Sequence, residues 1–375
     1  MADLNTTVWI FSILGFLIAA YSIVANDAIQ TLGTFLSSNA KRPWWVLWAY
    51  ACSIIVAVML WGFLGGNGDI AFDRLNSLPY PEGGVQWWHA IPPLFLLILT
   101  RYGIPVSTTF LVLTIFALTG GANTEGVLPK MLVKSGLGYI VAIGAAFFVY
   151  LLISRVFERW IERTKDQPHH PAWFAAQWAA TAFLWSQWLM QDLANIFIFL
   201  PRTTELVPVL DGSGAPLLRE GVAVMQTQVS FSPLLLAFAT VVMLALHAII
   251  FRNRGGEIQK IVLSKTNSTD IRAATAIDVI YGIILFVFKE LNDVPMSTTW
   301  VFLGMLAGRE IAIAYIAGLR SRLAALWDVT SDVLRAFLGL IISVVLAIFL
   351  PAWARGELGV LMSDLPGYVA RALGL

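Results

Sequence analysis

The stretch Pro105-Val-Ser-Thr-Thr-Phe110 decides the fold, because a near copy, Pro295-Met-Ser-Thr-Thr-Trp300, recurs in the second half of the chain. Each copy interrupts an apolar region with a proline and hydroxyl side chains. Apolar segments at residues 91–100 and 110–119, each about half a membrane long, flank the first copy. This arrangement predicts a re-entrant or broken helical hairpin, which survives at membrane depth only against protein or a water-filled cavity.

The composition of the 375-residue chain indicates a membrane protein. Hydrophobic residues make up 58% of the sequence and charged residues 13%, with a mean hydropathy of +0.76. A soluble domain usually carries about 25% charged residues, so this chain could not cover its surface with polar groups in water. With 24 Lys and Arg against 23 Asp and Glu, it also lacks a basic field for nucleic acid. The expected partner is therefore the lipid bilayer, with no nucleic acid.

Six stretches are long and apolar enough to cross ~30 Å of hydrocarbon. They cover residues 8–25, 44–64, 131–154, 172–190, 233–251 and 333–353. If each broken region enters and leaves on one side, the basic loops all fall on the same face; these loops are 37–43, 155–165, 252–272 and 320–322. By the positive-inside tendency that face is cytoplasmic. We expect an integral, multi-pass protein of the plasma (inner) membrane with both termini outside.

The two halves of the chain carry the same order of parts. Residues 1–165 and 166–375 each hold a membrane helix followed by an Asp motif, a second crossing, a broken hairpin and a final crossing. The first half starts outside and the second inside, so the halves are inverted copies. The predicted fold class is an all-α polytopic membrane protein of two inverted-topology repeats, each with three crossing helices and one re-entrant or broken hairpin. Such repeats are typical of secondary transporters with the site at the repeat interface.

The hairpin tips at residues 105–109 and 295–299 hold the first group of candidate residues. Proline suits a helix start, and Ser and Thr are preferred N-caps. Half-helices that begin there would present backbone N–H groups, hydroxyls and positive dipole ends to an oxyanion. The alternative is that the hydroxyls only bond back to their own helices. The predicted substrate-binding residues are Ser107, Thr108, Thr109, Ser297, Thr298 and Thr299.

Two aspartates form the second group. Asp27 lies in a motif at residues 26–34 and Asp192 in a motif at residues 191–195, and each ends an apolar run. A carboxylate at such depth costs about 3 kcal/mol, so it tends to face a cavity, to pair or to bind a cation. The alternative is an ordinary interfacial Asp at a helix end. The predicted coupling residues are Asn26, Asp27, Gln30, Gln191, Asp192 and Asn195, with Na⁺ held at Asp27 and Asp192 or H⁺ exchanged there, and with no other cofactor.

In their order along the chain, these four motifs resemble the inorganic phosphate transporter family. Members of that family have inverted repeats, each with a Gly-Ala-Asn-Asp-x-Ala-Asn motif and a Pro-x-Ser-Thr-Thr-His motif. The resemblance implies that the motif Asp, Asn, Ser and Thr residues surround the anion and the co-transported Na⁺ or H⁺, and that the protein is a homodimer. This sequence departs from the family pattern at Gln30, Gln191, Phe110 and Trp300. Sulfate or a related oxyanion is therefore the alternative to phosphate.

The predicted function is cation-coupled symport of a small inorganic oxyanion. An intramembrane enzyme that uses Asp27 or Asp192 is a second hypothesis, but the sequence has no nucleophile–base or metal-cluster pattern. An anion channel is a third, although a continuous pore has no need of paired Asp motifs. We expect a transporter and not an enzyme. Among the remaining charged residues, Arg309 and Glu310 are expected to face protein or water, and Asp278 to lie at the membrane interface.

Overall fold

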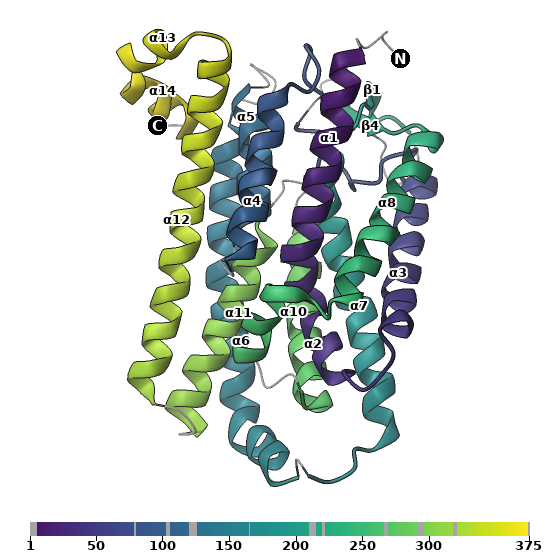
Figure 1. Cartoon of the computed structure of the whole chain (residues 1–375), viewed down its shortest axis with the longest axis vertical. Helices are drawn as coiled ribbons and strands as arrows, with labels where there is room; N and C mark the ends of the chain where they lie inside the picture. Colours follow the sequence, from purple (N-terminus) through teal and green to yellow (C-terminus); the bar gives the residue numbers. More distant parts are fainter. Residues whose placement is uncertain are drawn as a thin grey trace.

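The structure, a computed structural model, is a bundle of long helices (Figure 1). It describes residues 6–78, 80–102, 106–119, 126–164, 166–209, 215–219, 222–265, 269–291, 296–317 and 321–373. Within these residues, six helices are long and apolar enough to cross a membrane. The predicted all-α polytopic fold is confirmed, and the few strands are short.

The helices of the first half are α1 (Thr6–Ile23), η1 (Val24–Ala28), α2 (Ile29–Ser38), α3 (Trp44–Gly65), η2 (Trp87–Ala90), α4 (Ile91–Arg101), η3 (Thr109–Leu113), α5 (Thr114–Thr119) and α6 (Val127–Arg163).

The first membrane helix is longer than the sequence predicted. The elements α1, η1 and α2 follow one another without a break, so Asp27 lies inside a helix and does not end it. The polar residues after residue 25 are buried against protein, and for that reason they do not require the helix to stop.

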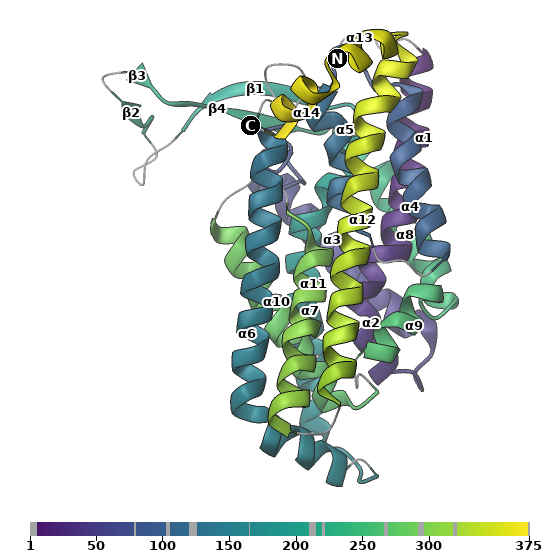
Figure 2. The ribbon, with the colours of Figure 1, turned by 90° about the vertical axis from the view of Figure 1, so that its left-hand side faces the viewer.

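The second half adds a projecting β-hairpin. Its elements are α7 (Pro171–Phe197), β1 (Thr203–Pro208), β2 (Leu218–Arg219), β3 (Val222–Ala223), β4 (Met225–Ser230), α8 (Pro233–Arg252), α9 (Gly256–Lys265), α10 (Ile271–Leu291), α11 (Thr298–Ala312), η5 (Ile313–Ala317), α12 (Arg322–Ala354), α13 (Leu358–Ser363) and α14 (Leu365–Leu373). The strands pair antiparallel, β1 with β4 and β2 with β3. They extend sideways from the end of the bundle where α1 begins (Figure 2).

The apolar helices differ from the predicted crossings at two places: α7 is not among them, and Ile271–Phe288 of α10, which was predicted as part of a broken hairpin, is. By length and hydropathy they are Thr6–Ser38, Trp44–Gly65, Val127–Leu151, Pro233–Arg252, Ile271–Phe288 and Arg322–Ala354. The predicted crossing at residues 172–190 falls on α7, which has 27 residues but buries polar side chains such as Gln177, Thr181 and Gln191. These side chains lower the hydropathy of α7 because it faces other helices more than lipid.

Two helical hairpins approach the middle of the bundle from opposite ends. The helices α4 and α5 lie in the half where α1 begins, and α10 and α11 lie in the other half (Figure 1). Their tips touch, because the Thr109 hydroxyl donates to the Met296 carbonyl at 3.0 Å and the Thr299 hydroxyl donates to the Val106 carbonyl at 3.4 Å. The prolines of both tips, at positions 105 and 295, lie outside the described residues. The division into two inverted repeats at residue 165 stays a prediction.

The ends of the bundle differ in charge. The start of α1 and the end of α12 lie together at one end, and the segment that joins α6 to α7 lies at the opposite end (Figure 1). We call this opposite end the basic end, since Arg42 lies in the connection between α2 and α3, Arg163 ends α6, and Arg254 lies in the connection between α8 and α9. Which side of the membrane it faces stays a prediction.

The helices α11 and α6 pack with almost no space between their backbones. A Cβ atom on Gly304 would lie 2.6 Å from the Tyr139 carbonyl oxygen, and one on Gly308 would overlap the Ile143 carbonyl oxygen. Small residues four apart allow such close approach of membrane helices. This contact fixes the second hairpin against α6 and so positions its tip.

Candidate functional site

The predicted site residues converge in the middle of the bundle. They come from the first long helix, from α7 and from both hairpin tips. Each of them is at most 3% exposed; the set is Asn26, Asp27, Gln30, Ser107, Thr108, Thr109, Gln191, Asp192, Asn195, Ser297, Thr298 and Thr299. Polar groups buried to this extent need partners, so their hydrogen bonds show what the cluster can do.

Asp27 joins the two hairpin tips. Its Oδ2 atom accepts a hydrogen bond from the Thr108 hydroxyl of the first tip, and its Oδ1 atom accepts one from the Thr299 hydroxyl of the second tip at 3.2 Å. Oδ1 also accepts from Asn26 Nδ2 at 2.7 Å and from Gln30 Nε2 at 3.4 Å. Asp27 is therefore saturated with neutral donors.

Irregular helix geometry places these groups in the first half. Asp27 lies in the π-helical turn η1, and η3 begins at Thr109 directly after the first tip. The wider turn of η1 lets Asn26 donate to the Val106 carbonyl at 2.9 Å. Single π-helical turns are uncommon and occur frequently at functional sites.

Asp192 is just as buried as Asp27 but accepts fewer hydrogen bonds. Its Oδ1 atom accepts from Asn195 Nδ2 at 2.6 Å, and the same Asn195 group lies 3.2 Å from the Thr109 hydroxyl oxygen and 3.3 Å from that of Thr108. Thr298 and Thr109 lie near the carboxylate. Asp192 Oδ2, Asn195 Oδ1 and Gln30 Oε1 are nevertheless buried with no partner at hydrogen-bonding geometry among the described residues. The cluster thus has three unused oxygen acceptors.

The two aspartates interact electrostatically. Asp27 and Asp192 are close enough for each carboxylate charge to affect the other. Two like charges in a buried site repel strongly, and a bound cation relieves that repulsion. Carboxylate and amide oxygens are hard ligands of the kind that Na⁺ takes.

The serines of the tips act as helix caps. Ser107 Oγ accepts from the Phe110 N–H at 3.3 Å, and Ser297 Oγ accepts from the Trp300 N–H at 3.2 Å. The Ser297 N–H in turn donates to the Ser135 hydroxyl of α6 at 2.9 Å. The threonines, not the serines, reach the aspartates in this structure. A substrate-binding role for the tip hydroxyls stays a prediction.

Arg74 is the site residue that the sequence analysis missed. It lies after α3, is 1% exposed, and donates from Nε to Gln191 Oε1 at 3.0 Å. Its charge attracts that of Asp192. The Gln191 amide nitrogen donates to the Leu285 carbonyl of α10 at 3.2 Å, so both ends of this amide are engaged. One signal was available, since Arg74 is the only Lys or Arg between residues 43 and 100.

Another buried carboxylate, that of Asp278, lies outside the central cluster. Asp278 of α10 was expected at the membrane interface, but it is fully buried and the expectation is wrong. It accepts from Thr34 of α2 at 2.5 Å, and from Thr181 and Gln177 of α7 at 2.7 and 3.0 Å. Because three helices supply its environment, no local sequence pattern revealed it.

Arg309 and Glu310 face protein, as expected. Arg309 is 4% exposed and its guanidinium lies over the ring of Tyr150, 5.5 Å from the centroid. It also contacts Glu310 at 3.4 Å. Neither residue belongs to the central cluster.

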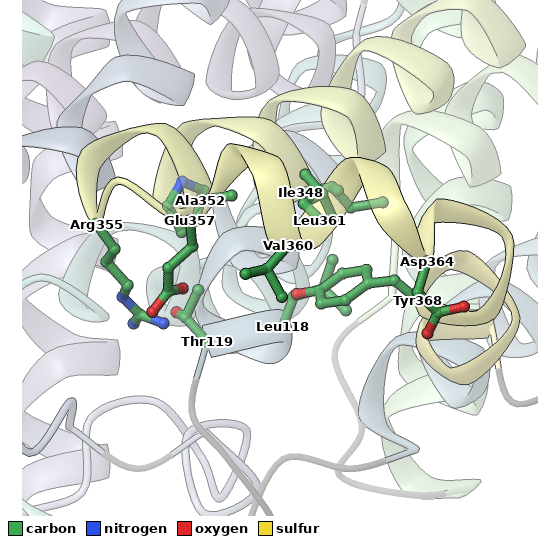
Figure 3. Close-up of a pocket in the computed structure, with 11 residues that line it drawn as sticks. Leu118, Thr119, Ile348, Ala352, Arg355, Glu357, Val360, Leu361, Asp364 and Tyr368 are labelled. Atoms are coloured by element: carbon green, nitrogen blue, oxygen red, sulfur yellow. The ribbon is translucent and has the colours of Figure 1, made fainter.

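A surface pocket lies away from this cluster. It is formed between α5, the end of α12, α13 and α14, with Arg355 and Glu357 at one side and Tyr368 and Asp364 at the other (Figure 3). None of the predicted site residues lines it. The candidate site is therefore the occluded cluster in the centre of the bundle.

Comparison with known proteins bears on the fold. A solved structure described as the sodium-dependent phosphate transporter is similar to this chain with a TM-score of 0.53, over 92% of this chain and 98% of that chain, at 17% identity. The chain shares the all-α polytopic membrane fold of that structure. No family model and no curated protein matches the sequence.

Proposed function

We propose that this protein is a cation-coupled secondary transporter of a small inorganic oxyanion, with phosphate as the first candidate and sulfate or a related oxyanion as the alternative. One observation carries the proposal: hydroxyls from both hairpin tips and two motif aspartates meet in one buried cluster. The fold similarity to a structure described as a sodium-dependent phosphate transporter supports it.

In this proposal, the hairpin tips supply the hydrogen-bond donors that bind the anion. The helix α11 begins at Thr298 behind the Ser297 cap, and η3 begins at Thr109. The first N–H groups of a helix lack partners within the helix and attract negative charge. Two such ends with threonine hydroxyls suit a tetrahedral oxyanion, which offers several acceptor oxygens.

In this proposal, the two Asp motifs supply the oxygen ligands that bind the cation. Asp192 Oδ2, Asn195 Oδ1 and Gln30 Oε1 have no hydrogen-bond partner among the described residues, and they are oxygen ligands of the kind that Na⁺ takes. A cation bound there reduces the negative charge that opposes the anion, so each ligand strengthens binding of the other. That reciprocal effect is the thermodynamic basis of coupled transport.

The burial of the cluster fits alternating access. With side chains no more than 3% exposed, the site opens to neither end in this structure. Movement of the hairpin elements against the rest of the bundle would expose it to one side at a time. A continuous pore is not consistent with this burial, and we therefore favour a carrier over a channel.

Uptake of radiolabelled phosphate and sulfate into proteoliposomes, with and without a Na⁺ or H⁺ gradient, tests the proposal. We expect concentrative uptake only with a cation gradient. Asp27→Asn and Asp192→Asn should each lower the rate about tenfold or more, because loss of one charge-assisted ligand costs at least ~1.4 kcal/mol of binding.

Asp364→Asn is the matched control, since Asp364 is exposed and lines the surface pocket, which contains none of the cluster residues (Figure 3). It should transport like the wild type. Wild-type uptake by both Asp27→Asn and Asp192→Asn, in protein that purifies normally, would remove the proposed site.

A further inference from the structure

The two Asp motifs have similar sequences but different electrostatic surroundings. The hydrogen-bond donors to the Asp27 carboxylate are neutral, and the charge that acts on it most is the repulsive one of Asp192. Asp192 Oδ2 has no hydrogen-bond partner within the described part of the chain, and the carboxylate is attracted by the charge of Arg74. The positive charge of Arg74 therefore stabilises the carboxylate of the Asp192 motif and not that of the Asp27 motif.

Burial of the Arg74 guanidinium requires compensation by negative charge. Arg74 donates to two neutral acceptors, Gln191 Oε1 at 3.0 Å and the Phe72 carbonyl at 2.9 Å. A buried arginine is costly without a nearby anion. The carboxylates of Asp192 and Asp69 both attract it, but the Asp69 oxygens already accept from the Ala71 and Asp73 N–H groups at 2.7 and 2.6 Å. Asp192 Oδ2 accepts no hydrogen bond from the described residues, so it is the more available of these two carboxylates for the guanidinium.

The segment that carries Arg74, residues 66–78, is folded into the end of the bundle where α1 begins. Its apolar side chains, including Ile70 and Leu75, are fully buried. Phe72 and Asp73 have φ angles of 52° and 65°, a left-handed conformation that non-glycine residues rarely adopt. Such backbone persists only where the surroundings impose it, and it is frequent at functional sites. Here it turns the chain directly before Arg74 and delivers the guanidinium to α7.

We propose that Arg74 is a charge-compensating residue of the second motif: its guanidinium balances Asp192 while no coupling cation is bound there, and the cation competes with it. This inference rests on the proposed function. The two motifs then differ in how they bind a cation. At Asp192 the cation competes with the Arg74 guanidinium for the carboxylate, whereas at Asp27 Arg74 does not compete with it.

Gln191 connects this exchange to the second hairpin. Its Oε1 atom accepts from Arg74, and its Nε2 atom donates to the Leu285 carbonyl of α10. When a cation binds the Asp192 carboxylate and neutralises its charge, the attraction between Asp192 and Arg74 decreases. The segment at residues 66–78 and the arm of the hairpin share this one amide, so cation binding loosens both together.

The test uses Arg74→Gln and Arg74→Lys in the full-length protein, reconstituted in proteoliposomes. We expect Arg74→Gln to lower the Na⁺ concentration for half-maximal oxyanion uptake about fivefold or more, the lower bound for coupled sites. The KM for the oxyanion at saturating Na⁺ should stay within about twofold. Arg74→Lys keeps the charge and should remain near the wild type. If uptake depends on H⁺ and not Na⁺, the same shift is measured by titrating external pH.

Arg202→Gln is the matched control. Arg202 is a second arginine at the same end, and it donates to the Leu78 carbonyl at 2.5 Å and the Ile198 carbonyl at 2.9 Å. Its loss should lower stability without changing the cation dependence. An unchanged or higher Na⁺ requirement in Arg74→Gln would overturn the proposal, and so would a rise in the oxyanion KM alone, which would make Arg74 an anion ligand.

A second readout keeps the proposal testable if Arg74→Gln folds poorly. Purified Arg74→Gln should gain more in Tm on addition of Na⁺ than the wild type does, and Arg74→Gln with Asp192→Asn should recover the yield, because neither charge is then unbalanced. Failure of the double variant to recover would overturn the inference. Wild-type protein without any cation dependence would instead defeat the proposed function itself.

Discussion

Asp278 shows how a single buried carboxylate can hold three helices together. It accepts hydrogen bonds from Thr34, Thr181 and Gln177, and all of these side chains are buried. An acceptor in such a place has no water to replace it. Its removal leaves several donors without partners, at a cost of about 1–3 kcal/mol for each group.

We predict that Asp278→Ala lowers the apparent Tm of the purified protein by several degrees, a loss of about 3 kcal/mol. Asp278→Asn should lose less, because it keeps one acceptor oxygen and the Gln177 Oε1 atom, which has no partner among the described residues, can accept from the new amide. Thermal unfolding in detergent measures both. Equal Tm values for Asp278→Ala and the wild type would show that this carboxylate does not link the helices.

At the residue scale, motif repetition predicted the convergence of Asp27, Asp192 and the tip threonines. These residues stand at matched breaks in the apolar pattern, and such breaks are visible in one sequence. Arg74 and Asp278 were missed or misplaced because their partners come from elements 97 or more residues away, as with Thr181 and Asp278. Contacts between helices that are far apart in the sequence depend on how the helices pack, and the pattern of hydrophobic residues along the chain does not specify that packing.

At the element scale, the first membrane helix is the main difference from expectation. Hydropathy placed its end at residue 25, because Asn26 and Asp27 are polar. The helix continues to Ser38 because α2 is covered by other helices and lipid does not reach its polar residues. Hydropathy predicts where lipid contacts a helix, and it loses that meaning for a segment enclosed by protein.

The contact between α11 and α6 gives a prediction at the same scale. We expect Gly308→Ala to destabilise the protein by about 1–3 kcal/mol, the usual cost of overpacking, because the new Cβ overlaps the Ile143 carbonyl. Gly144→Ala on α6 is the control, since a Cβ there meets open space, and it should be neutral or slightly stabilising. The apparent Tm of the two variants, measured by thermal unfolding, tests this prediction. Similar Tm values for Gly308→Ala and Gly144→Ala would argue against a close contact between α6 and α11.

At the scale of the whole molecule, the distribution of charge predicts the orientation. The basic connections lie at one end of the bundle, opposite the start of α1 and the β-hairpin (Figures 1 and 2). If that end is cytoplasmic, the hairpin of β1 to β4 faces outside. The homodimer that the family resemblance implies is a separate prediction, and it does not affect this one.

Cysteine labelling tests the orientation. The native thiol, Cys52, is buried and should not react with a membrane-impermeant maleimide in intact cells. We expect Val222→Cys, at a position 70% exposed on β3, to be labelled from outside. Lys260→Cys on the exposed face of α9 should be labelled only after the membrane is opened. The reverse pattern would mean that the basic end faces outward.

The glycine contact between α11 and α6 has a mechanical consequence. Carbonyl oxygens of α6 touch the backbone of α11 with no side chain between them, so the two helices cannot slide along each other without colliding. We therefore expect a displacement of the second hairpin to carry α6, which is 37 residues long, with it. In the proposed carrier, the surfaces that move past one another would then lie on the other faces of this pair of helices.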